Sequence, residues 1–337
     1  MPKIGLLPMW FFVFSTCPLA AQDPAPSAKD RDTSPHTVQF VTVDKEVKLE
    51  TLDWGGTGRT LVFLSGLGAT AHQFDKFALK LTGSYHVYGI TRRGYGESSV
   101  PPLTGANYDA DRLGDDVLEA CAALKLERPV LVGHSIAGQE LSSVGSRHPE
   151  RVAGLIYLDA VWPYSFYDAA RGDLWFDVQE VKNRIEELQG PGDHMRLISE
   201  LLEKSLPQLE KTLKRTHEFQ QHFVAEGLEP FAPFPRNRLP VSQGIRDGAR
   251  KYTGFRGVPV LAIVAQPRDP WPAPPVWKDK PALIAEIDAE ELAHDNAFEN
   301  GIAGARVVRL AHATHIIYQS NEADVMREMN SFLAGLK

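Results

Sequence analysis

The apolar residues of this chain fall into short runs that are separated by longer segments with helical spacing. Residues 37–43 and 47–54 alternate apolar and polar positions on either side of Asp44-Lys45-Glu46, a pattern that predicts a β-hairpin. The later runs are continuously apolar, as in strands buried on both faces of a sheet. They cover 60–64, 85–90, 130–132, 154–158, 258–264 and 306–310. Helical spacing is found at 73–81, 109–124, 139–147, 282–300 and 322–336. This alternation predicts an α/β fold, with a mostly parallel central sheet covered by helices on both faces.

The alternation of strands and helices is interrupted between residues 162 and 252. No convincing apolar strand occurs in this stretch of the sequence, and helical spacing dominates it. The helical segments are 174–188, 195–202 and 206–226. We interpret residues 162–252 as a helical cap, inserted between the two parts of the α/β core at 37–161 and 253–337.

The first residues have the pattern of a secretory signal peptide, to which we assign residues 1–21. Lys3 is followed by an apolar run over 4–14 and then by small residues. The apolar run is too short, and too interrupted by Pro8, for a good membrane span.

Export changes the expectations for the rest of the chain. Residues 22–36 have the composition of a disordered linker. The mature protein is expected in the periplasm or outside the cell, with Cys121 as its only cysteine and therefore no intrachain disulfide. Attachment to a lipid through Cys17 is the alternative.

Composition and charge exclude some classes of protein and some kinds of binding partner. With 43% hydrophobic and 23% charged residues the bulk of the chain is neither disordered nor collagen-like. The formal net charge is −7 and no block of Lys and Arg occurs, so a nucleic-acid partner is not expected. The number of subunits does not follow from the sequence.

One stretch, residues 129–138, organises the candidate chemistry. A short apolar run ends at Gly133, His134 and Ser135 follow, and small residues then lead into a helical segment. This stretch resembles the nucleophile elbow of the α/β-hydrolase family, Gly-x-Ser-x-Gly, in which a tight turn between strand and helix presents a serine hydroxyl. Ala137 replaces the last glycine, and Gly138 follows it. A chance strand-turn-helix is the plain alternative.

Two further turns are similar to those of the same family. Residues 65–68, Ser-Gly-Leu-Gly, stand where the family places its oxyanion loop, so the resemblance implies that the backbone N–H groups of Leu67 and Ile136 hold the oxyanion. A plain glycine turn is the alternative. Residues 93–98 are similar to a structural turn of the family, with Thr91 where Asp is usual, and their glycine spacing does not fit a phosphate loop.

A serine nucleophile needs a base and an acid that orients the base. The family supplies the histidine from the loop after the last strand, where His315 fits better than His312, which follows the strand directly. Asp159, at the end of the strand that follows the elbow, is our first choice for the acid, and Asp269 is the alternative. Glu140, just after the elbow, is expected to be a solvated helix charge.

We therefore expect an exported serine hydrolase that cleaves a carboxylic ester, with a lactone as one form, through an acyl-enzyme. No cofactor or metal is implied, and a small-molecule ester is the expected partner. Aromatic residues near the ends of the cap suggest an apolar or aromatic pocket, although they equally suit packing of the cap. They are Trp162, Tyr164, Phe166, Tyr167, Trp175, Phe176, Trp271 and Trp277. The same triad acting on a C–C or peptide bond, or in perhydrolysis, is the second hypothesis, and a non-catalytic binding protein on this fold is the third.

Overall fold

The computed structural model describes residues 34–104, 106–227, 240–268 and 280–337, and its centre is an eight-stranded sheet. The strands follow the order β1-β2-β4-β3-β5-β6-β7-β8. They are β1 Thr37–Asp44, β2 Val47–Gly55, β3 Thr60–Leu64, β4 His86–Ile90, β5 Val130–His134, β6 Gly154–Leu158, β7 Val260–Ala265 and β8 Ala305–Leu310. β2 pairs antiparallel with β1 and β4, and the other pairs are parallel. The predicted α/β class with a mostly parallel sheet is confirmed.

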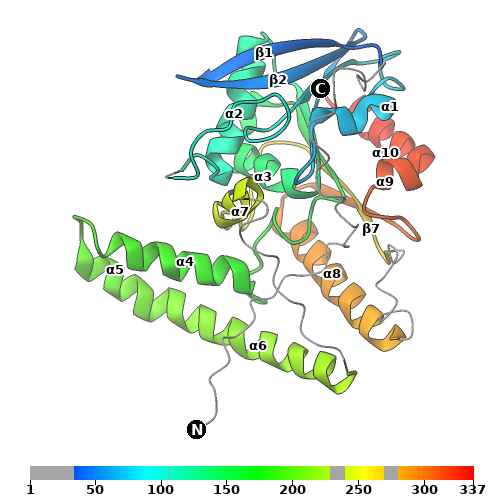
Figure 1. Ribbon diagram of the computed structural model, residues 1–337. Coiled ribbons are helices and arrows are strands. Elements are labelled where there is room, and N and C mark those ends of the chain that lie inside the picture. Colours follow the sequence, from blue (N-terminus) through cyan, green and yellow to red (C-terminus); the bar gives the residue numbers. More distant parts are fainter. Residues whose placement is uncertain (1–33, 105, 228–239, 269–279) are drawn as a thin grey trace. The chain divides into compact units, whose positions relative to one another are not determined.

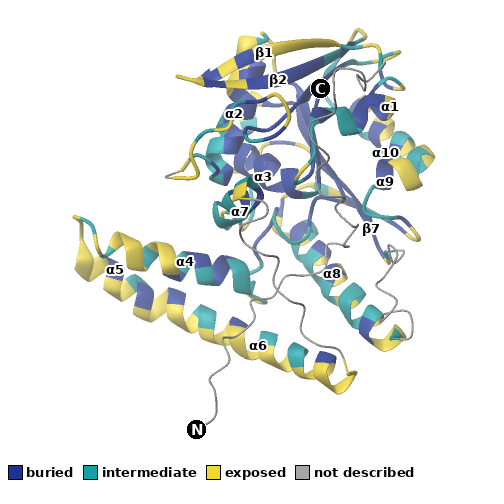
Figure 2. Cartoon of the chain, in the orientation of Figure 1, coloured by how far each residue is buried: buried dark blue, intermediate teal, exposed yellow. Residues whose placement is uncertain are grey.

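Helices cover both faces of this sheet, as Figure 1 shows. Because side chains of a strand point alternately to the two faces, Val62 and Leu64 join one apolar core while Leu61 and Phe63 join the other. The first core is closed by α2 Ala110–Ala123, α3 Gly138–Arg147 and the end of α8 Pro281–Gly301. The second is closed by η1 Ala71–Phe74, α1 Asp75–Ala78, α9 Ile317–Ser320 and α10 Glu322–Ala334. Figure 2 shows that the central strands are buried.

The chain divides into two compact units, and the second is helical. Among the described residues the helical unit comprises 167–227, Pro240 and 280–287, and the α/β unit comprises the remainder. The helical unit contains α4 Leu174–Glu187, α5 His194–Glu200, a π-helical turn Leu201–Ser205 and α6 Leu206–Ala225. Asp173 begins α4 by accepting bonds from the N–H groups of Trp175 and Phe176.

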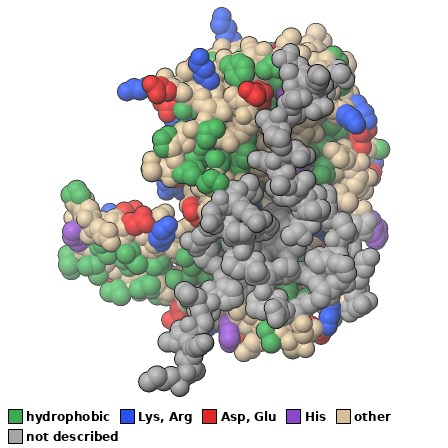
Figure 3. All heavy atoms as spheres, in the orientation of Figure 1, with side chains coloured by type: hydrophobic (Ala, Val, Ile, Leu, Met, Phe, Trp, Pro, Cys, Tyr) green, Lys and Arg blue, Asp and Glu red, His purple; other side chains and the backbone are tan. Residues whose placement is uncertain are grey.

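Large apolar side chains are exposed along α5, the π-helical turn and α6, and Figure 3 shows hydrophobic side chains gathered on this unit. They are Met195, Ile198, Leu202, Leu206, Leu213 and Val224. Over the described ranges, the structure contains no helix with both the length and the apolar character of a membrane span.

The predicted elements agree with the structure except in a few short segments. The segment expected as one helix at 73–81 consists of the 3₁₀ turn η1 and the single turn α1. Two short helices, α7 Pro240–Asp247 and α9, were not predicted. The signal peptide at 1–21 and nearly all of the linker at 22–36 lie outside the described residues, as does Asp269. The assignment of 162–252 as a cap stays a prediction.

Candidate active site

Ser135 lies at the turn between β5 and α3, in the short 3₁₀ segment Ser135–Ala137. Its φ of 57° is in the left-handed region, which a residue with a side chain adopts only under strain and under constraint from its surroundings. The constraint is the close packing of strand and helix. A Cβ added to Gly138 would lie 1.9 Å from the carbonyl oxygen of Ala160, so only glycine fits there. The turn leaves Ser135 partly exposed between buried neighbours.

The structure brings Ser135, His315 and Asp159 into one hydrogen-bonded chain. His315 Nε2 lies 2.9 Å from Ser135 Oγ, and His315 Nδ1 lies 2.6 Å from Asp159 Oδ2. The other carboxylate oxygen of Asp159 accepts a 3.0 Å bond from the N–H of Ala265, which fixes the acid against β7. A base hydrogen-bonded to both a nucleophile and an orienting carboxylate is the arrangement that activates a serine.

Of the two competing candidates, the structure describes only His312. His312 is exposed, and its backbone N–H donates to the carbonyl of Pro267. Asp269, the alternative acid, lies outside the described residues. The catalytic roles of Ser135, His315 and Asp159 stay predictions, but the distances satisfy the geometric condition for them.

Arg268 touches both the acid and the base, and it was missed in the sequence. Its Nη1 lies 2.7 Å from Asp159 Oδ2 and 3.3 Å from His315 Nδ1. Burial alone would raise the pKa of Asp159, but Arg268 and the bond from His315 lower it to about 2. Asp159 is therefore a carboxylate at neutral pH. In the sequence, Arg268 and the neighbouring prolines suggest a surface loop, whereas the structure places the guanidinium against Asp159 and His315.

A second carboxyl group, Glu291 of α8, shares Arg268 with Asp159. Arg268 Nη2 lies 3.2 Å from Glu291 Oε2. Burial, together with the nearby carboxylates of Asp159 and Asp288, outweighs the attraction of Arg268 and raises the pKa of Glu291 to about 7. One guanidinium thus faces two acids, and Asp159 holds the charge while Glu291 titrates near neutrality. No sequence signal joins these residues, because 23 positions separate Glu291 from Arg268.

His134 supports the base from the other side. Its Nε2 lies 2.9 Å from the backbone oxygen of His315, and the two rings are 4.7 Å apart. Burial, followed by the neighbouring His315, lowers the pKa of His134 to about 3. His134 is therefore neutral, and its N–H holds the backbone that carries His315.

The predicted oxyanion loop lies against the elbow. A Cβ added to Gly66 would lie 3.5 Å from Cβ of Ser135, and Leu67 packs with Ile136 in one apolar cluster. Ile136 is the second residue of the helical segment that begins at Ser135, a position whose N–H has no acceptor within the helix. The N–H groups of Leu67 and Ile136 are thus carried by two segments that meet beside Ser135, although their role stays a prediction.

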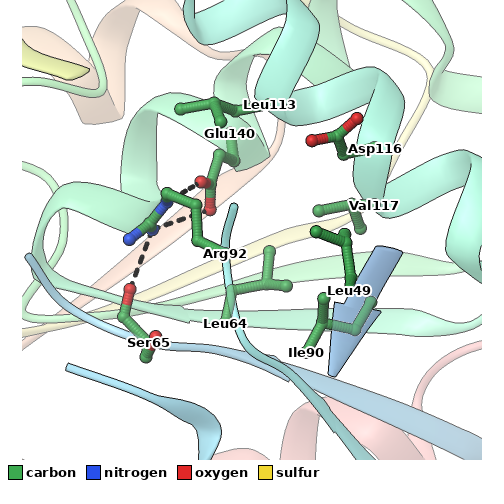
Figure 4. A pocket seen from close by; sticks show the side chains of 9 residues that line it. All are labelled: Leu49, Leu64, Ser65, Ile90, Arg92, Leu113, Asp116, Val117 and Glu140. Carbon is green, nitrogen blue, oxygen red and sulfur yellow. Dashed lines mark hydrogen bonds and ion pairs between the residues drawn. The ribbon is translucent and has the colours of Figure 1, made fainter. Parts of the chain in front are cut away.

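A buried ion pair connects these two segments, as Figure 4 shows. Arg92 bonds both carboxylate oxygens of Glu140, in the first turn of α3, and its Nη2 donates a 2.9 Å bond to the carbonyl oxygen of Ser65. Both charged side chains are nearly inaccessible to solvent. The expectation that Glu140 is solvated was wrong, because Glu140 is buried in an ion pair with Arg92. The local sequence could not reveal this pair, since its two residues are 48 positions apart.

The aromatic residues near the ends of the predicted cap are buried or partly buried wherever the structure describes them. Phe166 is buried against Phe298 of α8, and Tyr167 and Phe176 are buried against each other. Tyr164 instead packs against the cluster that holds Ile136, close to the elbow. Trp271 and Trp277 lie outside the described residues.

Comparison with known proteins concerns the family and the fold of this chain. A family model described as "Alpha/beta hydrolase family" matches residues 61–328. A putative non-heme haloperoxidase of Mycobacterium phage D29 is 30% identical over 114 residues, 34% of this chain and 40% of that protein. A fluoroacetate dehalogenase of Burkholderia sp is 33% identical over 116 residues, 34% of this chain and 38% of that protein. The matches thus span about two fifths of each relative.

Solved structures share the fold. The crystal structure of a hydrolase from Pseudomonas aeruginosa PA01 has a TM-score of 0.52 at 22% identity, with 88% of this chain and 98% of that chain covered. At this identity the likeness concerns the fold alone.

Proposed function

Since the chain belongs to the alpha/beta hydrolase family, we propose that it is an exported serine hydrolase that cleaves a carboxylic ester, with a lactone as one form. The observation that supports this is the hydrogen-bonded chain from Ser135 Oγ through His315 to Asp159, with distances of 2.9 and 2.6 Å. The orientation of the imidazole follows from the ionised state of Asp159, which accepts the Nδ1–H bond.

In the proposed reaction His315 Nε2 takes the proton of Ser135 Oγ as the oxygen attacks the acyl carbon. The negative oxygen of the tetrahedral intermediate is held by the N–H groups of Leu67 and Ile136, and one such donor contributes about 3–4 kcal/mol in known enzymes. The proton then passes from His315 to the leaving alkoxide, and the acyl group stays on Ser135. Water, deprotonated by His315, attacks this ester, and the proton returns to Ser135.

The acyl group is proposed to be apolar or aromatic. The supporting observation is that Leu67, Ile136 and Tyr164 belong to one apolar cluster beside the elbow. A panel of p-nitrophenyl esters and lactones tests this. Apolar or aromatic acyl groups should give the highest kcat/KM, and a preference for charged, sugar-like esters would contradict the apolar site.

A fluorophosphonate probe tests the nucleophile directly. Wild type should be labelled, Ser135→Ala should not, and His315→Ala should react far more slowly. His312→Ala is the matched control, since this exposed histidine follows the same strand, and it should react like wild type. Equal labelling of Ser135→Ala and wild type would refute the proposal. Lack of labelling in all of them would favour a binding protein.

The same triad acting on another bond is the alternative. A nucleophilic Ser135 disfavours chemistry that uses an aspartate nucleophile, as in the dehalogenase and epoxide-hydrolase branches of the family. Perhydrolysis, or cleavage of a C–C or peptide bond, stays open, and the ester panel separates these from esterase activity by comparing kcat/KM values.

Export is proposed from the signal-peptide pattern of residues 1–21. N-terminal sequencing of material collected outside the cytoplasm should give a start near Ala21 or Gln22. A chain that starts at a lipid-modified Cys17 would replace this with a membrane-anchored protein.

A further inference from the structure

Two histidines and a buried aspartate meet at the start of α1. Asp75 Oδ2 lies 3.0 Å from His72 Nδ1, and Asp75 Oδ1 lies 3.8 Å from His36 Nδ1. One ligand atom from each of the three residues lies within 4.8 Å of the other two. A tetrahedral Zn²⁺ ion with bonds of about 2.0–2.1 Å separates its ligand atoms by roughly 3.4 Å. Shifts of about 1 Å or less in these side chains therefore give the spacing of a zinc site.

The surrounding groups orient the candidate ligands in the way that metal sites require. Trp54 Nε1 donates a 2.8 Å bond to Asp75 Oδ1. On the other side of the His72 ring, Nε2 lies 3.8 Å from Glu50 Oε1, and Glu50 Oε2 accepts a 2.7 Å bond from the hydroxyl of Thr91. A histidine that ligates metal through one nitrogen and faces a carboxylate with the other is a common feature of zinc proteins.

The buried negative charge of the cluster also favours a bound cation. Asp75 and Glu50 are 5% and 4% exposed, so both carboxylates are buried. Within the described parts of the chain, no Lys or Arg lies within ion-pair distance of either carboxylate. Burying charge without a partner is costly, so positive charge must come from protonated histidine or from a metal ion.

We propose that His36, His72 and Asp75 form a binding site for Zn²⁺ or a similar divalent transition metal, with Glu50 as the carboxylate that orients His72. Two imidazoles and one carboxylate favour Zn²⁺ over Ca²⁺ or Mg²⁺, which prefer oxygen ligands. The fourth position would be taken by water.

Such an ion would tie three parts of the α/β unit together. His36 precedes β1, His72 lies in η1, and Asp75 begins α1. The segment between β3 and η1 carries Leu67, and Gln73, next to His72, lies 3.5 Å from His134 Nδ1. A metal here would act as a structural ion that fixes the end of this segment. This inference does not depend on the proposed esterase activity.

Isothermal titration of the chelator-treated full chain with ZnCl₂ tests the site. Wild type should bind one equivalent at pH 7.5 and bind more weakly below about pH 6.5, because the histidines must be neutral to ligate. CaCl₂ should give no saturable binding at the same concentrations. Glu50→Gln should lower the affinity about 10- to 100-fold, and His72→Ala should lower it further.

His86→Ala is the matched control. His86 Nε2 lies 2.9 Å from Asp53 Oδ1, and neither residue belongs to the three-ligand group of the described residues. This variant should keep the affinity of wild type. His36→Gln, at the start of the described chain and outside the strands, should lose binding with an unchanged circular dichroism spectrum. Absence of saturable Zn²⁺ binding to wild type, or equal binding to well-folded His36→Gln, would overturn the site.

Discussion

Replacing Glu140 by Gln should destabilise the protein strongly, although the two side chains have nearly the same shape. Glu140 and Arg92 are about 3–4% exposed as side chains, so the change leaves a buried guanidinium without its counter-charge. Removing one partner of a buried ion pair costs about 3–5 kcal/mol of unfolding free energy. Arg92 keeps its 2.9 Å bond to the carbonyl of Ser65, and the new amide oxygen can accept one bond, so the lower end, about 3 kcal/mol, is expected.

Urea unfolding, followed by tryptophan fluorescence and far-UV circular dichroism, measures this loss as a shift in midpoint at constant slope. Glu322→Gln is the matched control, because Glu322 pairs with Lys80 at 2.6 Å while both side chains are 38% or more exposed. Exposed pairs contribute about 0–1 kcal/mol. A loss below about 1 kcal/mol in Glu140→Gln, equal to that of the control, would refute the reasoning.

The double variant Arg92→Met/Glu140→Met separates charge from packing. Replacing both members of a buried pair by apolar residues is often neutral, but here the carbonyl of Ser65 loses a donor, at about 1–3 kcal/mol. The double variant should therefore be more stable than Arg92→Met alone and less stable than wild type. It should also lower kcat on the best ester, since Arg92 holds the segment that carries Leu67.

Three further outcomes are expected. Asp159→Asn should lower kcat about 10⁴-fold, as the corresponding substitution of the triad acid does in a serine protease. Steady-state kinetics on a p-nitrophenyl ester measures this loss. A folded variant with nearly wild-type kcat would assign the role of the acid to Asp269. Gly138→Ala should lose soluble expression or several degrees of melting temperature, because its Cβ would lie 1.9 Å from the Ala160 oxygen, whereas Ala137→Gly should change little. The pKa of Glu291 is raised to about 7 from an unfolded value near 4.5, so its stabilising contribution is complete below about pH 4.5 and is lost as pH rises through about 7. The urea midpoint of wild type should fall from pH 5 to pH 8 by more than that of Glu291→Gln, and parallel profiles would contradict this.

The sheet could be predicted because its signal is local. Strands such as β3 and β6 are continuous apolar runs bounded by Gly or polar residues. Each run by itself predicts a strand that is buried on both of its faces. The helix α7 was missed because it has only eight residues, Pro240–Asp247, and only Ser242 and Ile245 are buried. A helix of that length is decided by its tertiary contacts rather than by its periodicity.

The candidate site was predictable where its members end neighbouring strands and, for His315, where the family resemblance implies a histidine in the loop after the last strand. Ser135 and Asp159 follow β5 and β6, which pair directly, so their proximity follows from chain order. Arg268, Glu291 and Arg92 could not be placed in this way. Their partners are distant in sequence, and a charged residue next to a turn has the same appearance whether it is solvated or buried against an opposite charge.

The left-handed backbone at Ser135 restricts which amino acids evolution or an engineer can place there. At a φ of 57° a β-branched residue is strongly disfavoured, whereas Asp and Asn enter this region more readily than most residues. Threonine is therefore a poor substitute for Ser135 despite its hydroxyl group, while cysteine and aspartate fit the same backbone. The elbow therefore accepts nucleophilic side chains that are not branched at Cβ. A single substitution at position 135 can replace the serine hydroxyl by a thiol or a carboxylate without a change in the backbone around it.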